Sequence, residues 1–291
     1  MMKALNYALK LLCNRNRDGS FAKQTARERI LTLIANQLER LGFRNLAIDG
    51  LKPKHVTALV AQWKNESLSA GTIKNRMSEV RWWAEKVNRQ NVVARSNDFY
   101  DIDRRVFVTN ESKAERLDAD RLAKVRDPYS AMSFKLTDAF GLRRETALKI
   151  QPAWADRGDH LLLKASWTKG GKEYAVPIRT DYQRQVLAEA THLAATTREK
   201  SLIQQPTYKA QLQRFVYQTN KAGIDGVHAF RHSYAQRRYL ELTGRECPAN
   251  GGKISKQLTP MEKDQDREAR LTISRELGHE RESVTAIYLG R

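Results

Sequence analysis

Residues 227–239 read VHAFRHSYAQRRY and carry the clearest local signal in the chain. The pattern predicts a helix that begins at about His228 and places His228 and Arg231, three positions apart, on one face. His228 and His232 also have the spacing of zinc ligands, but Ala229 stands where a zinc protease carries its glutamate base. The stretch therefore favours a site built from an imidazole and a guanidinium, without a metal ion.

Three other segments offer cationic or hydrogen-bonding side chains. The segment GLRRETALKI places Arg143 at the start of a helix. The segment TKGGKEYAVPI has glycines between two extended runs, which is typical of a β-hairpin, and it offers Lys169 and Lys172. The segment ELGHERESVTAIYLGR contains His279 and, nine residues later, Tyr288. Each residue alone has an ordinary structural explanation, so only the combination is informative.

The order and spacing of these motifs resemble the tyrosine recombinases, a family that includes phage integrases and bacterial chromosome-dimer recombinases. The family pattern is an arginine in a Gly-Leu-Arg segment, a hairpin lysine, His-x-x-Arg, Leu-Gly-His and a tyrosine nine residues further on. The matching residues here are Arg143, Lys169, His228, Arg231, His279 and Tyr288. The motifs cover about residues 117–291, whereas the N-terminal helices are similar to the family's core-binding domain only in composition and placement.

The resemblance implies a phosphate chemistry that suits these residue types. Arginine stays protonated and offers parallel donors, so Arg143 and Arg231 would bind the phosphodiester and stabilise its transition state. His279 would donate a hydrogen bond to a phosphate oxygen. A tyrosine hydroxyl needs a base or a positive field to act as a nucleophile, and the expected base for Tyr288 is His228.

The leaving 5′-oxygen needs an acid, for which the resemblance favours Lys169, with Lys172 of the same turn as the alternative. The implied product is a 3′-phosphotyrosyl link with a free 5′-hydroxyl. Because this link keeps the bond energy, neither a cofactor nor a metal ion is expected. The sequence agrees, since it contains neither a phosphate-binding GxxxxGK[ST] loop nor a GxGxxG segment.

Some neighbouring residues complicate the assignment. Arg144 follows Arg143, but the preceding Gly-Leu pair favours Arg143 as the family's first arginine. The family usually has an acidic residue three positions later, where this chain has Thr146, with Glu145 one place early. Such an acid supports the site without reacting, so a shifted supporting contact is expected. His232 is expected to support the site as well.

The charge of the chain favours a nucleic-acid partner. Its 291 residues include 52 Lys and Arg against 33 Asp and Glu, for a formal net charge of +19. The positive charge is spread over both parts of the chain, with a net charge of +10 over residues 1–110 and +9 over the remainder. No apolar run is long enough to span a membrane. The two distant cysteines, Cys13 and Cys247, favour a reducing cytoplasm over a disulfide scaffold.

The apolar periodicity predicts a fold that is mainly α with a small β-sheet. An all-α core-binding domain is expected over residues 1–105, a linker over 106–116 and an α+β tyrosine-recombinase catalytic domain over 117–291. The expected helices lie at about 3–12, 23–41, 53–63, 69–87, 119–125, 130–139, 181–195, 209–221, 228–242 and 267–277 and around the last tyrosine, and the expected strands lie at 160–167 and 173–178.

We expect two features to distinguish this chain from other members of the family. The polar residues 244–266 predict a long loop that touches DNA or a neighbouring protomer, or else forms a surface insertion. Only three residues follow Tyr288, whereas many family members have a longer segment that docks on the next protomer. That exchange would be shorter here, or use another element, or be lost from a truncated chain.

The sequence therefore predicts a site-specific DNA recombinase of the integrase type, which integrates or excises a mobile element. The expected partners are double-stranded DNA clamped between the two domains, a homotetramer on paired sites, and accessory DNA-bending proteins, with no membrane. The expected location is the bacterial cytoplasm, at the nucleoid. Two alternatives stay open, namely a type IB topoisomerase-like relaxase and a catalytically silent member that only holds or bends DNA.

Overall fold

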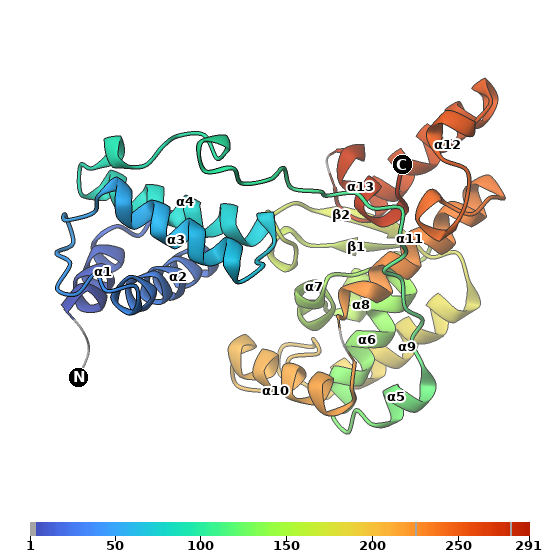
Figure 1. Cartoon of the computed structure of the whole chain (residues 1–291). Helices are drawn as coiled ribbons and strands as arrows, with labels where there is room; N and C mark the ends of the chain where they lie inside the picture. Colours follow the sequence, from blue (N-terminus) through green and yellow to red (C-terminus); the bar gives the residue numbers. More distant parts are fainter. Residues whose placement is uncertain (1–3, 225, 280) are drawn as a thin grey trace. The chain divides into compact units, whose positions relative to one another are not determined.

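The structure is a computed structural model that describes residues 4–224, 226–279 and 281–291. The chain, drawn in Figure 1, divides into two compact units, Met1–Val106 and Phe107–Arg291. Each unit has its own hydrophobic core. Each unit is described below by itself. Lys3, with which the first helix was expected to begin, lies outside the described residues.

The first unit is helical. Its elements are α1 (Ala4–Arg15), α2 (Phe21–Arg40), α3 (Pro53–Asn65), α4 (Ala70–Lys86) and the 3-10 turns η1 (Gln90–Val92) and η2 (Asp98–Tyr100). Ser20 and Ser69 cap α2 and α4, since each hydroxyl accepts a hydrogen bond from a backbone N–H of the first turn. Trp63 and Trp83 are fully buried at the centre of the bundle, so their apolar area makes a large contribution to its stability.

The second unit contains the one β-sheet found among the described residues. Its helices are α5 (Ala119–Ala123), α6 (Pro128–Phe140), α7 (Arg144–Lys149), α8 (Pro152–Ala155), α9 (Asp181–Ala195), α10 (Tyr208–Lys221), α11 (His228–Thr243), α12 (Pro260–Glu276) and α13 (Glu282–Leu289). The strands are β1 (His160–Leu163) and β2 (Tyr174–Pro177), and the 3-10 turns are η3 (Ala165–Trp167), η4 (Pro248–Asn250) and η5 (Ser255–Gln257). The predicted fold class, mainly helical with a small sheet, is confirmed.

The two strands form an antiparallel hairpin whose inner face covers the core. Leu161 lies opposite Val176 and Leu163 lies opposite Tyr174. Leu161, Leu163 and Val176 are fully buried while their neighbours along the strands are partly exposed. This alternation is expected of a sheet with one face on the core and one toward solvent.

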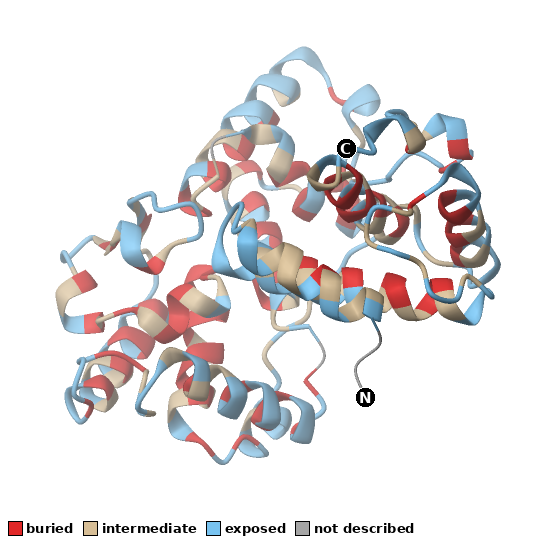
Figure 2. Cartoon of the chain, turned by 90° about the vertical axis from the view of Figure 1, so that its left-hand side faces the viewer, coloured by how far each residue is buried: buried red, intermediate tan, exposed pale blue. Residues whose placement is uncertain are grey.

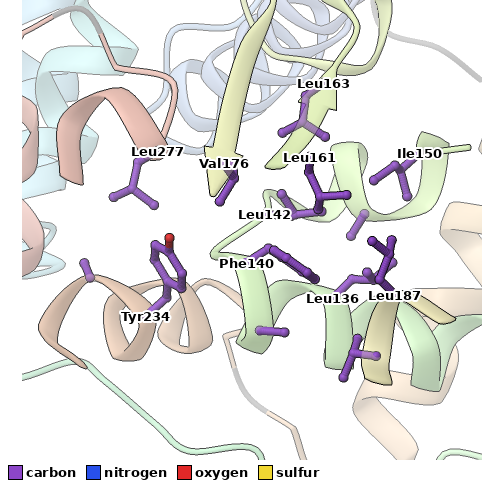
Figure 3. Close-up of a cluster of buried hydrophobic side chains, with 14 of the residues drawn as sticks. Leu136, Phe140, Leu142, Ile150, Leu161, Leu163, Val176, Leu187, Tyr234 and Leu277 are labelled. Atoms are coloured by element: carbon purple, nitrogen blue, oxygen red, sulfur yellow. The ribbon is translucent and has the colours of Figure 1, made fainter. Parts of the chain in front are cut away.

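The main core lies between this hairpin and the surrounding helices. Figure 3 shows Leu161 and Val176 of the hairpin close to Phe140 of α6. On another side of α6, Phe134 and Phe215 of α10 form a second cluster, with ring centroids 4.8 Å apart. The helices accordingly show buried residues on one side and exposed residues on the other (Figure 2). Each large apolar side chain buried in this way contributes roughly 1.5–3 kcal/mol.

The prediction of a loop over residues 244–266 is wrong for residues 260–266, because α12 already begins at Pro260. The hydroxyl of Thr259 accepts from the N–H of Glu262, and the carboxylate of Glu262 accepts from the N–H of Thr259. This reciprocal capping box satisfies two donors at the start of the helix. It explains how a highly charged stretch without a clear apolar stripe becomes helical.

The strand predicted at residues 160–167 is also too long, since β1 ends at Leu163. The chain turns at η3 instead, and the turn carries Trp167 into the core. There the Trp167 ring packs edge-on against Trp154, with ring centroids 5.4 Å apart. Burial of a large aromatic side chain outweighs the loss of further strand pairing.

Gly141 ends α6 in the left-handed conformation, with φ +63°. A Cβ atom built on Gly141 would lie 2.7 Å from Cδ1 of Tyr234 and 3.0 Å from Cδ2 of Leu277. The end of α6 therefore approaches α11 and the end of α12 so closely that no side chain fits between them. The turn sends Leu142 into the core and leaves Arg143 at the start of α7.

We expect Gly141→Ala to destabilise the second unit much more than Gly244→Ala. Gly244 also has a positive φ, but nothing lies within 4 Å of its Cβ position, so alanine there adds about 1 kcal/mol of backbone strain. At Gly141 the overlap with Tyr234 comes in addition, for a total of about 3 kcal/mol. Urea unfolding of the full chain, followed by circular dichroism, measures both changes. Equal losses would contradict the steric argument.

Candidate active site

Arg231 is the buried centre of the predicted site, with 0% of its side chain exposed. Its Nη1 donates to the carbonyl of Gly141, and its Nη2 donates to the carbonyl of Leu277. Nη2 also lies 3.1 Å from Nε2 of His279, and Nε donates to the hydroxyl of Tyr288 at 3.2 Å. One guanidinium thus joins the end of α6, the end of α12 and helix α13.

The hydroxyl of Tyr288 lies between a guanidinium and an imidazole. It is 3.0 Å from Nε2 of His228, in addition to its contact with Arg231. The side chain is only 4% exposed, and three imidazole rings surround it. Its ring centroid lies 4.6 Å from that of His232 and 5.5 Å from those of His228 and His279. The contacts allow the hydroxyl to accept from Arg231 while it donates to His228.

Arg143 adds a second positive charge from the start of α7. Its Nη1 is buried and has no hydrogen-bond partner among the described residues, and the same is true of Nδ1 of His279. Burial lowers the pKa of Arg143, and the neighbouring charge of Arg231 lowers it further. Two guanidiniums held near each other with an open donor are costly unless an anion joins them. The arrangement therefore suits a bound anion.

Lys169 stands in the turn that joins the two strands. The hydroxyl of Thr168 donates to the carbonyl of Lys172 at 2.6 Å and accepts from the Lys172 N–H at 3.1 Å, which closes the turn. Lys169 lines a cleft of about 530 Å³ together with Arg143 and His228. Lys172 is not among the described residues that line this cleft, which favours Lys169 as the lysine of the site.

The imidazoles around Tyr288 are neutral at pH 7. Desolvation lowers the pKa of His228 to about 4, and the nearby arginine and lysine charges add to the effect. Desolvation and the arginine charges lower the pKa of His279 to about 3, and desolvation lowers that of His232 to about 4. A neutral His228 is able to accept a proton from Tyr288. The positive charge of the site therefore rests on arginine and lysine.

Thr146 occupies the position where the family pattern has an acidic residue, and it forms a supporting contact of its own. Its buried hydroxyl donates to the carbonyl of Trp167 at 3.0 Å and so connects α7 to the turn after β1. The adjacent Glu145 pairs with Lys149 of the same helix at 2.5 Å. Thr146, and not the displaced acid, thus joins the segment of the first arginine to the hairpin.

The structure brings all six predicted residues into one region of the second unit. Four of them, Arg231, Tyr288, His228 and His279, are linked by short polar contacts. The remaining two, Arg143 and Lys169, line the adjoining cleft. Their roles in a reaction stay predictions.

Neither a metal centre nor a membrane segment is found in the part of the chain that the structure describes. No group of three His, Cys, Asp or Glu side chains there is arranged to hold a metal ion. None of the described helices is long and apolar enough to cross a membrane.

Two family models match this chain. The model described as "Phage integrase, N-terminal" matches residues 2–93, and the model described as "Integrase" matches residues 106–237, so that together they cover more than half of the chain. The chain belongs to the tyrosine recombinase family. The second match ends within α11, so His279 and Tyr288 of the recombinase lie beyond it.

Solved structures of DNA-bound recombinases share the fold. The XerH site-specific recombinase bound to difH substrate is 15% identical, with a TM-score of 0.56 over 97% of this chain and 80% of that one. The lambda integrase dimer bound to a COC′ core site is 15% identical, with a TM-score of 0.59 over 99% and 95%. The Tn1549 transposon integrase in complex with circular intermediate DNA is 14% identical, with a TM-score of 0.50 over 100% and 96%. No curated protein sequence matches the recombinase.

Sequence reasoning missed Tyr174 as a residue of this site. Its ring lies against Gly278, where a Cβ atom would be 2.5 Å from Cε1 of the ring, and its hydroxyl lies near Arg143. It follows the turn that carries Lys169, five positions further on. The predicted strand at residues 173–178 was the available signal, because it places Tyr174 on the strand that leaves the turn.

The histidines of the recombinase are expected to make it less stable in mild acid. An unfolded histidine binds a proton near pH 6.5, whereas folded His279 and His232 do so only at about pH 3 and 4. Between these values the unfolded state binds more protons, so the free energy of unfolding decreases as the pH falls from about 6.5 toward 4. Melting temperatures measured by circular dichroism at pH 7 and pH 5 would show the decrease.

A pair of variants tests the source of this decrease. His279→Asn is expected to recover about 1 kcal/mol of the loss at pH 5. His192→Asn, at an exposed position on α9, is expected to leave the pH dependence as it is. A melting temperature that stays constant from pH 7 to pH 5 in the unmodified recombinase would rule the explanation out.

Proposed function

We propose that this recombinase cleaves and rejoins double-stranded DNA through a 3′-phosphotyrosyl intermediate on Tyr288. The observation that carries the proposal is the position of the Tyr288 hydroxyl, 3.0 Å from Nε2 of His228 and 3.2 Å from Nε of Arg231. The open Nη1 of Arg143 belongs to the same region. A nucleophile, a base and cations for a phosphate thus share one site.

In the first step the oxygen of Tyr288 attacks phosphorus while its proton passes to Nε2 of neutral His228. The new bond joins phosphorus to the tyrosine oxygen, and the bond from phosphorus to the 5′-oxygen breaks. Negative charge grows on the equatorial oxygens, where preorganised cations stabilise it by about 3 kcal/mol for each good donor. Arg143 supplies an open donor. Arg231 contributes its charge, while its Nε donates to the Tyr288 hydroxyl and one N–H of each terminal nitrogen is taken by a backbone carbonyl.

The leaving 5′-oxygen takes a proton from Lys169 and departs as a hydroxyl. A 5′-hydroxyl from the same or another strand then attacks the phosphotyrosine, returns a proton to Lys169 and releases Tyr288, which recovers its proton from His228. Each bond that is broken is matched by one that forms. The steps therefore balance without an external energy source.

DNA is the proposed substrate because a formal charge of +19 suits a polyanion and the similar solved structures are DNA complexes. Integration or excision of a mobile element is the proposed role, supported by the phage integrase family match and by the likeness to a transposon integrase. The lambda integrase tetramer bound to a Holliday junction, 14% identical with a TM-score of 0.57, supports a homotetramer as the working assembly.

We expect the unmodified recombinase to form a covalent adduct with nicked suicide duplexes, and Tyr288→Phe to form none. The nick lets the short cleaved strand diffuse away, so the attached protein is trapped. Removal of the hydroxyl removes the nucleophile, and the rate of adduct formation should fall by about three orders of magnitude or more. Denaturing gels measure the adduct on a randomised DNA library, and sequencing the trapped DNA identifies the site.

Tyr217→Phe serves as the matched control, because Tyr217 is an exposed tyrosine of α10 and should keep the adduct. An adduct of equal yield in Tyr288→Phe would place the nucleophile elsewhere and end this mechanism. Salt-sensitive DNA binding without an adduct in any variant would favour a binding role. Relaxation of supercoiled DNA without exchange between two sites would favour a relaxase.

A sulfur atom at the 5′-bridging position of the trapped site is expected to identify the general acid. A thiolate leaves without a proton at neutral pH, so Lys169→Ala should be slower with the oxygen substrate by about 10²–10⁴-fold and close to normal with the sulfur substrate. Lys172→Ala should change neither rate by more than about twofold. Adduct formation under single-turnover conditions measures both. If the sulfur substrate instead rescued a slow Lys172→Ala variant, Lys172 would be the general acid.

A further inference from the structure

The backbone that follows Tyr288 is held by side chains from three different elements. The carbonyl of Tyr288 accepts from Nε2 of Gln236 on α11 at 3.1 Å. The carbonyl of Gly290 accepts from Nη1 of Arg270 on α12 at 2.9 Å. Asn110 binds the backbone of Arg291 twice, since its Nδ2 donates to the Arg291 carbonyl oxygen at 3.0 Å and its Oδ1 accepts from the Arg291 N–H at 2.9 Å.

Asn110 belongs to residues 107–116, which we call the strap. The strap opens the second unit and runs past α13 and α11 (Figure 1). Within it, Oγ of Ser112 donates to Oε1 of Gln236 at 3.0 Å, and the N–H of Glu115 donates to the carbonyl of Ala229 at 3.3 Å. Ala229 directly follows His228. The strap therefore contacts the segments that carry both the nucleophile and the base of the proposed reaction.

Gln236 connects the strap to the nucleophile through a single buried amide. It accepts from Ser112 on one side and donates to the carbonyl of Tyr288 on the other, and only 6% of it is exposed. A buried amide with both ends engaged has one preferred orientation, because any rotation would leave a polar group unpaired. A displacement of the strap at Ser112 is thereby passed on to residue 288.

Close packing at Gly290 strengthens this connection. A Cβ atom at Gly290 would lie 2.6 Å from Oδ1 of Asn110 and 2.7 Å from the backbone nitrogen of Ala249. The strap and the turn η4 therefore meet Gly290 without space for a Cβ atom. Contacts packed this closely transmit small displacements instead of absorbing them.

Helix α13 depends on such contacts because it has only eight residues, too few for stability in isolation. We propose that the strap positions the nucleophile, with Asn110 and Gln236 as positioning residues that set where the hydroxyl of Tyr288 stands relative to phosphorus. The inference rests on the proposed function, because only that function makes Tyr288 a nucleophile. The structural part of it, that Asn110 holds α13 in place, stands independently.

Asn110→Ala is the direct test, because Asn110 is exposed and its loss leaves no buried group unpaired in the core. At saturating suicide DNA we expect adduct formation to slow by about tenfold with DNA affinity unchanged, since a small misplacement of a nucleophile costs this much or more. Asn110→Asp keeps the acceptor for the Arg291 N–H and should recover part of the rate. Ser112→Ala, which frees one end of Gln236, should slow the reaction in the same direction by about threefold.

Two controls separate positioning from other effects. Glu111→Ala changes an exposed neighbour in the strap and should react at the normal rate. The 5′-sulfur substrate should leave Asn110→Ala slow although it rescues Lys169→Ala, because a misplaced nucleophile is not helped by a better leaving group. Normal rates in Asn110→Ala, rates raised by the substitution, or rescue by sulfur would each overturn the proposal.

Hydrogen exchange keeps this test distinct from that of the reaction. We expect the backbone amides of residues 282–291 to exchange about tenfold faster in Asn110→Ala than in the unmodified protein or in Glu111→Ala. If the unmodified recombinase forms no adduct, the proposed function fails, and the exchange experiment still decides whether the strap holds α13. Unchanged exchange in Asn110→Ala would refute the role of the strap.

Discussion

The burial of one positive charge organises the second unit. A guanidinium removed from water costs several kcal/mol unless its donors are satisfied, and Arg231 is satisfied by the carbonyls of Gly141 and Leu277 and by the hydroxyl of Tyr288. These acceptors are accessible because α6 and α12 end where they do. Arg143 and His279, each two positions after one of these carbonyls, are thereby brought close to α13. The positions at which α6 and α12 end therefore also determine where the residues of the site come together.

The site contains two kinds of side chain with different charge states. The arginines and Lys169 carry the positive charge, while desolvation and that charge keep the imidazoles neutral. A neutral imidazole accepts a proton, and the arginines are permanent cations that stabilise an anion, so neither kind of group has to change its protonation state before the reaction begins. The open Nη1 of Arg143 leaves a donor at the site that suits an anion.

The sequence contained enough to predict the fold class and the residues that gather around Arg231. Helices such as α2 and α4 follow from a repeating apolar stripe and a serine cap, both of which are local signals. The start of α12 was missed because a reciprocal cap of Thr259 and Glu262 decides it within a charged stretch. The end of β1 was missed because it depends on where the Trp167 ring finds a place in the core.

The contacts of the site were harder to predict than its membership. Motif order predicted the six residues, but no local pattern indicates that Thr146 would bind the carbonyl of Trp167, or that Asn110 would bind residue 291. Both contacts join segments far apart in sequence, and they depend on how helices pack after they have formed. The hydrogen bonds from Arg231 to backbone carbonyls were equally hard to predict. Motif order does not reveal which donors of an arginine are already engaged.

The deep placement of Tyr288 bears on the fate of a broken strand. Its side chain is 4% exposed and lies among three imidazole rings. In the proposed reaction, an ester formed there would be shielded from bulk water while the strand end stays bound to the recombinase. Competition between water and a strand end would then be settled by access more than by intrinsic reactivity. In the proposed reaction, the packing around one tyrosine would govern how often a cut DNA strand is resealed and how seldom it is lost to hydrolysis.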